Sequence, residues 1–250
     1  MRPEALTKSP EITEQRSDSH SLFFLDSSSA PPRLRGENDF LIWQLVDSAF
    51  PTGGFAHSAG LEAAWQHGEV RHREDLLSFM AASLNQAGRA LLPLAAAAYD
   101  EPERVGEFDR FCDAFTTNHV ANRASRLQGK TLLSAIERTF KIAAPGDVEI
   151  PFFHFAPVFG FGLRRLDLPR ELALRMFLFQ HLRGLLAAAV RLNIVGPMEA
   201  QVLQHQLAPR AEEIRRANEW LGVDDIAQTA PLLDLWQGAH DRLYSRLFQS

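Results

Sequence analysis

The 250-residue sequence predicts an all-α fold, a single-domain helical bundle of about ten helices. Hydrophobic residues recur at helical spacing along almost the whole chain, and Pro or Gly residues separate the periodic segments. Only residues 148–156, VEIPFFHFA, have strand-like composition, and Pro151 and Pro157 lower their strand propensity. The sequence has no second segment of this kind to pair with them, so we expect no sheet.

The N-terminal 37 residues differ in composition from the rest of the chain. They are rich in Ser, Pro, Glu and Arg, and contain SDSHS, DSSSAPP and RLRGEND in succession. Such a segment cannot bury enough apolar surface to offset the entropy that it would lose on ordering. We therefore predict a flexible tail over residues 1–37 and one all-helical domain over residues 38–250.

The first predicted helix carries apolar residues at the spacing of one helical face. These residues are Ile42, Leu45, Val46, Ala49 and Phe50. Pro51 and the pair Gly53-Gly54 should end this helix and form a loop. A second helix is expected over residues 58–67, where the Ser58 hydroxyl would accept a backbone N–H at the start and Gly68 would cap the end.

Later segments with the same periodicity complete the predicted bundle. Two of the long ones begin at a proline, whose missing N–H would have no partner in the first turn of a helix. The expected ranges are 76 to about 88, 105–115, a long helix ending near 143, 158–166, 169–193, 197–221 and 232–248.

Composition and charge exclude several classes of protein. Hydrophobic residues make up 46% and charged residues 23%, which is ordinary for a soluble globular protein. The net charge is −5 and we find no basic stripe in the sequence, so we expect no nucleic-acid partner. The single cysteine, Cys112, excludes an intramolecular disulfide and fits a reducing cytoplasm.

The chain is not expected to enter a membrane. Its most apolar stretch, residues 176–195, contains His181, Arg183 and Arg191, which is typical of an interior helix rather than a membrane span. The early apolar run at residues 22–25 is too short for the core of a signal peptide. We therefore expect a cytoplasmic protein.

Two short motifs resemble nucleotide-binding sites but lack residues that such sites need. Gly129-Lys130-Thr131 matches the end of a phosphate-binding loop, yet Ala124 occupies the position of the first glycine. Gly160-Phe161-Gly162 begins like a dinucleotide-binding fingerprint, but Arg165 stands where the third glycine belongs. We interpret the first motif as coincidence and the second as a close helix contact or a kink.

No set of residues assembles an enzyme active site. Residues 56–60, AHSAG, approach a nucleophile elbow with Ser58 as nucleophile, but a helix and a Pro-Gly loop precede them instead of a strand. The nine histidines include no pair three or four residues apart, so one helix cannot offer two imidazoles to a metal ion. We expect no catalysis, no metal site and no cofactor, while a helical hydrolase using Ser58 remains as an alternative.

Two segments have features that suggest a role beyond folding. The loop from Phe50 to Ser58 places Phe55 directly after two glycines, between two predicted helices. The chain end, residues 241–250, keeps Tyr, Leu, Phe and two arginines, whereas chain ends are usually polar. Such residues are typical of interface anchors, although a tight turn and a final helix packed on the core would also explain the two segments.

These two segments resemble the signatures of the UreF family of urease accessory proteins. The N-terminal one is WQLVDSAFPTGGFAHSAGLE, residues 43–62, and the C-terminal one is YSRLFQS, residues 244–250. Three shorter segments also match, at residues 123–126, 157–160 and 187–191. The resemblance covers residues 39–250. It departs from the family pattern at Gly54-Phe55, where the family often has Ser-Tyr or Ser-Phe, and at Gln249, where it often has a basic residue.

The resemblance implies a helical, homodimeric scaffold without catalysis of its own. It implies that the chain forms a complex with the accessory protein UreD, also called UreH, and with the GTPase UreG. This complex would act on apo-urease and promote nickel insertion. Because UreG would bind both the nucleotide and the metal, the resemblance implies no cofactor in this chain. A nickel chaperone in its own right remains as an alternative.

We expect the partner-binding residues to lie in the matched motifs. In this hypothesis Phe55, Tyr244 and Phe248 anchor UreD through apolar contacts, and Arg246 adds a charge-assisted hydrogen bond. A face built partly by the long helices would receive UreG. The candidate residues are Phe50, Pro51, Gly53, Gly54, Phe55, His57, Ser58, Glu62, Arg123, Arg126, Tyr244, Arg246, Leu247 and Phe248.

Overall fold

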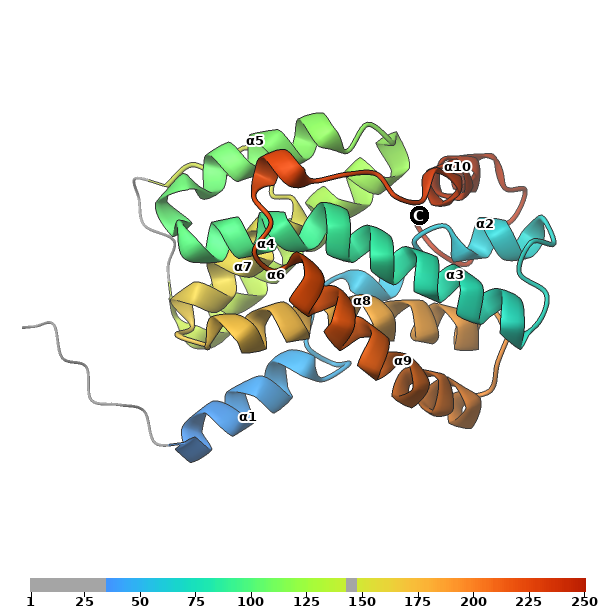
Figure 1. The fold of residues 1–250 in the computed structure, drawn as a ribbon, viewed down its shortest axis with the longest axis horizontal. Helices are drawn as coiled ribbons and strands as arrows, with labels where there is room; N and C mark the ends of the chain where they lie inside the picture. Colours follow the sequence, from blue (N-terminus) through green and yellow to red (C-terminus); the bar gives the residue numbers. More distant parts are fainter. Residues whose placement is uncertain (1–34, 143–147) are drawn as a thin grey trace, which may run out of the picture.

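The computed structural model describes residues 35–142 and 148–250, and every regular element within these ranges is a helix (Figure 1). The prediction of an all-α fold is therefore confirmed. The α-helices are α1 (Arg35–Val46), α2 (Leu61–Gln66), α3 (Arg73–Gln86), α4 (Leu92–Asp100), α5 (Val105–Phe115), α6 (His119–Phe140), α7 (Phe155–Arg165), α8 (Arg170–Arg191), α9 (Pro197–Asn218) and α10 (Pro231–Ala239). The predicted tail over residues 1–37 lies outside the described residues, apart from residues 35–37, which already belong to α1.

Helices α4 and α7 have the most extensive contact in the bundle, and α6 and α8 pack on the other sides of α7. Every residue of α7 from Ala156 to Leu163 is buried. Phe159 of α7 and Phe177 of α8 meet edge to face, with 5.4 Å between their ring centroids. The core is therefore centred on α7, and its aromatic side chains fix how α8 lies against it.

Two glycines allow backbones to touch where a side chain would keep them apart. A Cβ atom at Gly160 of α7 would lie 1.9 Å from the carbonyl oxygen of Ala95 in α4. A Cβ atom at Gly129 of α6 would lie 1.9 Å from the carbonyl oxygen of Phe153. The expectation of a close helix contact at residues 160–162 is confirmed, and Gly129 allows α6 to pack directly against the backbone of Phe153.

The first helix ends earlier than the sequence pattern indicated. Helix α1 stops at Val46, whereas its apolar periodicity continues to Phe50. The Asp47 carboxylate accepts a hydrogen bond from the backbone N–H of Ala49 at 2.7 Å and so closes a turn. Asp side chains compete in this way with the helical hydrogen bonds, which is the physical reason for the early end.

Two other predicted helices have different lengths in the structure. The helix expected to end near Gly88 continues through a wide turn at residues 87–91 into α4, and the missing Cβ of Gly88 makes room for the Ile214 side chain of α9. The periodic segment over residues 232–248 is helical only as far as Ala239 and in a short turn that follows. The remaining residues are extended because their backbone groups bond to other parts of the fold.

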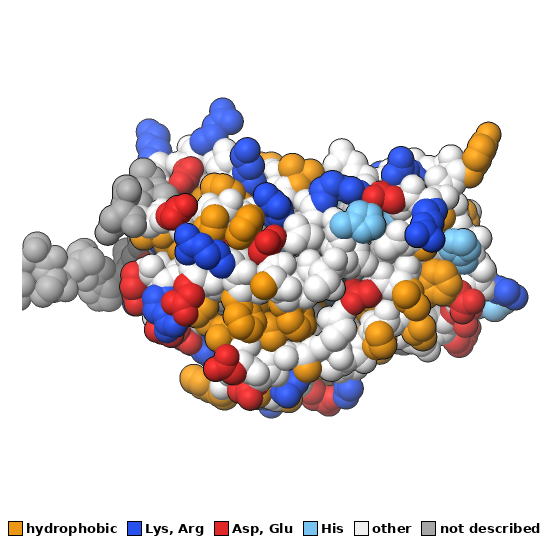
Figure 2. Space-filling view, turned by 90° about the horizontal axis from the view of Figure 1, so that it is seen from above, with side chains coloured by type: hydrophobic (Ala, Val, Ile, Leu, Met, Phe, Trp, Pro, Cys, Tyr) orange, Lys and Arg blue, Asp and Glu red, His pale blue; other side chains and the backbone are white. Residues whose placement is uncertain are grey.

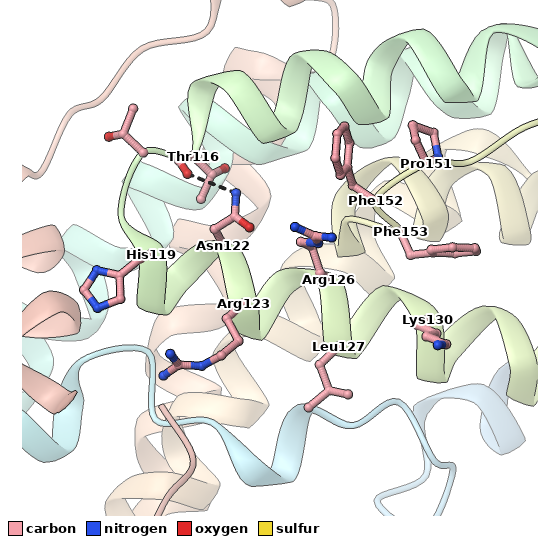
Figure 3. Close-up of a pocket in the computed structure, with 11 residues that line it drawn as sticks. Thr116, His119, Asn122, Arg123, Arg126, Leu127, Lys130, Pro151, Phe152 and Phe153 are labelled. Atoms are coloured by element: carbon pink, nitrogen blue, oxygen red, sulfur yellow. Dashed lines mark hydrogen bonds between the residues drawn. The ribbon is translucent and has the colours of Figure 1, made fainter.

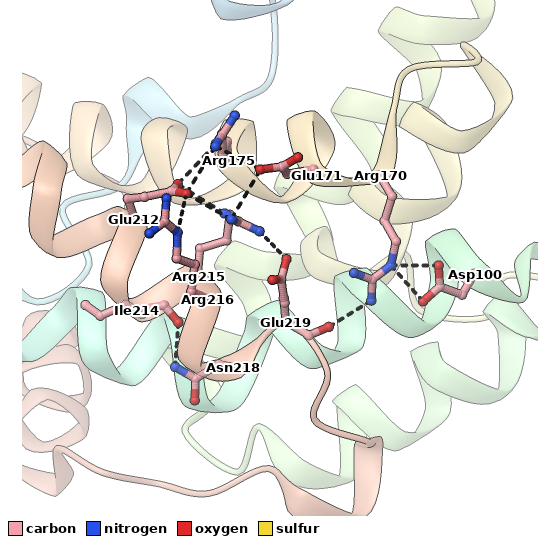
Figure 4. A network of polar contacts seen from close by, with 10 residues as sticks. All are labelled: Asp100, Arg170, Glu171, Arg175, Glu212, Ile214, Arg215, Arg216, Asn218 and Glu219. Atoms are coloured by element: carbon pink, nitrogen blue, oxygen red, sulfur yellow. Dashed lines mark hydrogen bonds and ion pairs between the residues drawn. The ribbon is translucent and has the colours of Figure 1, made fainter.

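An ionic network joins α8 to α9 (Figure 4). Arg215, almost fully buried, donates to Glu212, Glu219 and Glu171, and Arg175 donates to Glu212 at 3.1 Å. Hydrogen bonds from Arg215 and Arg175 hold the pKa of Glu212 well below its usual range. The carboxylate therefore stays ionised in acid, and the two helices keep their charge pairing.

Helix α8 is also the one helix of the described ranges with the length and apolar composition to cross a membrane. Of its most apolar window, 56% is buried inside the protein, where α8 packs against α4, α7 and α9. Burial of this kind is typical of the core helix of a bundle.

Candidate functional site

The two sequence motifs lie side by side in the structure. Residues 243–250 follow the short turn His240–Arg242 after α10 and run along residues 56–62, to which their backbone is hydrogen-bonded. The backbone N–H and the hydroxyl of Ser58 both donate to the carbonyl oxygen of Ser250, at 2.6 and 3.2 Å. One residue earlier, the N–H of Gln249 donates to a loop carbonyl at 2.8 Å. We call residues 54–62 and 243–250 together the C-terminal clasp.

Glu62 is the central acceptor of the C-terminal clasp. Its carboxylate lies in the first turn of α2 and is 1% exposed. It accepts hydrogen bonds from the backbone N–H groups of Leu247 at 2.6 Å and Phe248 at 3.2 Å, and from Nε2 of His240 at 2.9 Å. Hydrogen bonds to an ionised acceptor are among the strongest in proteins. Glu62 therefore holds the terminal segment in place from within the fold.

Arg191, at the end of α8, connects the two parts of the C-terminal clasp. Its guanidinium lies 4.1 Å from the ring centroids of both Phe55 and Phe248. It also donates to the carbonyl oxygens of Phe55 at 2.5 Å and Leu247 at 3.3 Å. The charge thus gains cation–π contacts and hydrogen bonds from both segments. Arg191 is missing from the predicted site, although it ends the matched segment 187–191.

Asp241 gathers basic side chains beside the C-terminal clasp. It accepts from Arg123 at 2.9 Å, His119 at 3.2 Å and Arg246 at 3.3 Å. Chiefly because of the hydrogen bond from Arg123, the pKa of Asp241 lies below its usual value. The chain separates Asp241 from Arg123 by 118 residues, so no local sequence signal could have identified this pair.

The predicted partner-binding residues divide into buried and exposed ones. The buried side chains are Phe50, His57, Ser58, Glu62 and Phe248. The exposed ones are Pro51, Phe55, Arg123, Arg126, Tyr244, Arg246 and Leu247, and Gly53 and Gly54 are half-buried. Of the buried side chains, His57, Ser58, Glu62 and Phe248 make contacts within the C-terminal clasp, whereas Phe50 stacks on Phe140 at the end of α6. Partner contact by the exposed residues stays a prediction.

Ser58 is not available as a nucleophile. It is 1% exposed, and its hydroxyl donates to the Ser250 carbonyl oxygen instead of to a histidine. The prediction that this hydroxyl caps the second helix is wrong, because α2 begins only at Leu61, after Gly60 with a φ of +86°. Within the described ranges, no three His, Cys, Asp or Glu side chains are placed to hold a metal ion.

The buried position of His57 should make the stability of the protein depend on pH. Its Nδ1 lies 2.5 Å from the Ser250 hydroxyl, and burial, with a smaller contribution from the charge of Arg123, lowers the pKa of His57 to about 4. The unfolded chain binds a proton near the ordinary pKa of 6.5, whereas the folded chain does not. The free energy of unfolding should therefore decrease as the pH falls from 6.5 towards 4, by about 3 kcal/mol through His57 alone.

Urea unfolding of the native chain and of His57→Gln at several pH values across this window tests the expectation. The variant should lose less stability on acidification than the native chain does. His181→Gln is a matched comparison, because burial also lowers the pKa of His181 to about 4 at a position outside the C-terminal clasp. Equal pH dependence in the native chain and His57→Gln would contradict the assignment to His57.

A basic groove runs along α6 next to the C-terminal clasp (Figure 3). It has a volume of about 670 Å³, and its lining includes His119, Arg123, Arg126 and Lys130 on α6 and residues 151–153 on the opposite side. The four basic residues lie four, three and four positions apart, which places them on one helix face. The expectation of no basic stripe is therefore wrong, because cations separated by uncharged residues gather into a row only once the helix forms.

Residues 70–208, more than half of the chain, match a protein-family model described as UreF. The chain belongs to the UreF family. The matched residues run from the segment before α3 into α9, so they include α6, its basic groove and Arg191. Both segments of the C-terminal clasp lie outside them.

Relatives of this UreF-family chain carry the names of urease accessory proteins. "Urease accessory protein F" of Oryza sativa subsp. indica is 40% identical over 216 residues, which cover 82% of this chain and 83% of the relative. The protein of the same name from Arabidopsis thaliana is 40% identical over 227 residues, 83% of this chain and 91% of the relative. "Urease accessory protein UreF" of Mycobacterium tuberculosis is 31% identical over 207 residues, 82% of this chain and 96% of the relative.

Proposed function

We propose that this UreF-family chain is a non-catalytic scaffold in urease maturation. It binds the accessory protein UreD (UreH) and the GTPase UreG, and with them promotes nickel insertion into apo-urease. In this proposal the partners bind the nickel and the GTP, and the complex works in the cytoplasm. Membership of the UreF family and the names of the relatives support the proposal.

The exposed ring of Tyr244 is the observation that carries the partner-binding part of the proposal. Its side chain is fully exposed, and no contact that the structure describes holds it. A few residues later, the backbone of Leu247 and Phe248 is fixed on Glu62. An aromatic side chain presented beside an ordered chain end is well suited to anchor a partner.

The buried contacts of the C-terminal clasp hold its exposed side chains in place before a partner binds. Phe55 is 69% exposed and Leu247 51% exposed, yet Arg191 contacts the first ring and bonds to the carbonyl oxygens of both residues. Binding to such a surface loses little conformational entropy, because the loop and the terminus are already ordered. The apolar anchors and Arg246 would then form one docking surface for UreD.

The homodimer of this proposal has support from apolar side chains on α1. Phe40 and Trp43 are 73% and 59% exposed, and their rings meet edge to face at 5.1 Å. Exposed aromatic pairs of this kind are typical of surfaces that a partner covers. Apolar side chains also gather in patches between charged ones on the face shown in Figure 2.

Size-exclusion chromatography with light scattering tests the scaffold function. We expect the chain to co-elute with UreD of the same source as a complex larger than either protein alone. Titration should then show that Tyr244→Ala and Arg246→Ala each weaken binding by about 2 kcal/mol, roughly thirtyfold, because such anchors carry much of the energy of an interface.

Met198→Ala is the matched control for these variants. Met198 is 79% exposed at the start of α9 and belongs to neither segment of the C-terminal clasp, so its truncation should leave the affinity unchanged. Urea unfolding of each variant shows whether the isolated fold keeps its stability. Separate elution of the two folded proteins would overturn the proposal, and an equal loss of affinity in all three variants would overturn the assigned surface.

A further inference from the structure

Helix α6 exposes more positive charge than the described residues of the chain neutralise. Arg126 and Lys130 form no ion pair with any residue that the structure describes, and both are exposed in the groove. Asp113 is close enough to feel the charge of Arg126, but its carboxylate accepts hydrogen bonds from Asn122 and His154. In a chain of net charge −5, this row is a local basic site.

One end of the row already binds a carboxylate. Asp241 accepts hydrogen bonds from both terminal nitrogens of Arg123, at 2.9 and 3.2 Å, and from His119 at 3.2 Å. This bidentate geometry is typical of arginine–carboxylate pairs, because the planar guanidinium matches the two oxygens of a carboxylate. The same helix face continues to Arg126 and Lys130, where the structure describes no acidic partner, so the row has room for further carboxylates.

The opposite side of the groove is held rigidly. The Asp109 carboxylate is fully buried and accepts the backbone N–H groups of Phe152 at 2.6 Å, Phe153 at 3.0 Å and His154 at 2.7 Å. The ring of Phe152 lies 5.1 Å from the guanidinium of Arg126, which faces it across the groove (Figure 3). A groove with one fixed side and one charged side is organised before any ligand arrives.

The length of the row fits a short extended peptide. His119 and Lys130 are eleven positions apart, which corresponds to about 16 Å along the helix axis. An extended chain covers that distance in about five residues. We propose that the groove of α6 binds an extended acidic segment of a partner protein, with carboxylates paired to Arg126 and Lys130 and apolar side chains against Phe152 and Leu127.

This inference adds a second binding surface to the proposed function and does not depend on it. The groove uses a face of α6 and residues 151–153, whereas the proposed UreD surface uses the C-terminal clasp. The probe can be a defined peptide, so no urease partner is needed. Failure of the peptide experiment and failure of the UreD experiment can therefore be told apart.

Fluorescence polarisation with a labelled hexaglutamate peptide tests the proposal on the full chain. We expect saturable binding at low ionic strength that weakens as salt is added, because exposed ion pairs are screened. The double variant Arg126→Glu/Lys130→Glu should weaken binding by about tenfold or more, since it removes two ion pairs and adds two repulsions. A hexaglutamine peptide should not bind.

Arg138→Glu/Lys141→Glu is the matched control. Both residues are exposed near the end of the same helix and outside the groove lining, so this variant changes the net charge equally. It should bind hexaglutamate as the native chain does. Equal weakening in both double variants, or no saturable binding by the native chain, would overturn the proposal. Tighter, groove-dependent binding of a single-stranded oligonucleotide than of the peptide would overturn it in favour of a nucleic-acid ligand.

Discussion

Glu62→Ala should release the C-terminal segment and lower the free energy of unfolding by about 3 kcal/mol. The substitution removes the one carboxylate that accepts from Leu247 N, Phe248 N and His240 Nε2. His240 is fully buried, so its ring would lose a partner that no water can easily replace. The loss is limited because the two backbone N–H groups can become solvated once the segment detaches. Urea unfolding measures the stability change.

Release of the segment has its own readout. Carboxypeptidase should trim residues 247–250 much faster in Glu62→Ala than in the native chain, and amide exchange should rise at Leu247 and Phe248. Glu69→Ala removes an exposed carboxylate just after the same helix and should change neither measurement. If Glu62→Ala retained native stability and native resistance to trimming, Glu62 would not be what holds the terminus.

Gly160→Ala should destabilise the fold by about 3 kcal/mol or more, since overpacking against a backbone cannot relax by a rotamer change. The added Cβ would lie 1.9 Å from the Ala95 carbonyl oxygen and 3.0 Å from the Tyr99 nitrogen. Helices α4 and α7 would have to separate, and with them the buried aromatic core around Phe159 would loosen. Thermal and urea unfolding both report this loss.

Gly184→Ala is the matched control for this substitution. Gly184 also lies within a helix, α8, but an added Cβ would have no heavy atom within 4 Å. Alanine should therefore stabilise the helix there by about 1 kcal/mol. Opposite signs for the two Gly-to-Ala changes would show that backbone contact, and not helix propensity, explains Gly160. Destabilisation of equal size at both positions would contradict this interpretation.

Helix positions were predictable wherever local signals agreed with the pattern of apolar residues. The helix expected over residues 105–115 is α5 with the same bounds, because its apolar stripe is uninterrupted and the short turn Pro102–Arg104 leads directly into it. The pattern failed where a side chain or a distant contact decided the end of a helix. Asp47 ended α1 early, and Gly88 let a helix continue because a neighbouring helix packed into the space.

In the candidate site, too, local sequence signals were predictive and contacts between distant residues were not. Its two segments were identified from sequence through their resemblance to the UreF signatures, and the loop and the terminus do lie together. Two of their inner supports, Arg191 and His240, were not identified, because they lie outside these segments. The buried state of Phe248 was likewise not predictable, since its apolar character suits a core position as well as an interface.

The sequence by itself determined the helical class and the family, because apolar periodicity and motif residues can be identified without knowing which segments touch. Only the tertiary structure decided which of these residues face solvent. In the sequence, Glu62 cannot be distinguished from any other carboxylate in the first turn of a helix. It accepts hydrogen bonds from the C-terminal segment only because folding brings residues 178 to 186 positions away next to it. The basic groove likewise exists only in the folded chain, since one side of it is a face of α6 and the other side is formed by residues 151–153. Contacts between distant segments are set by packing and burial, which local sequence patterns do not encode.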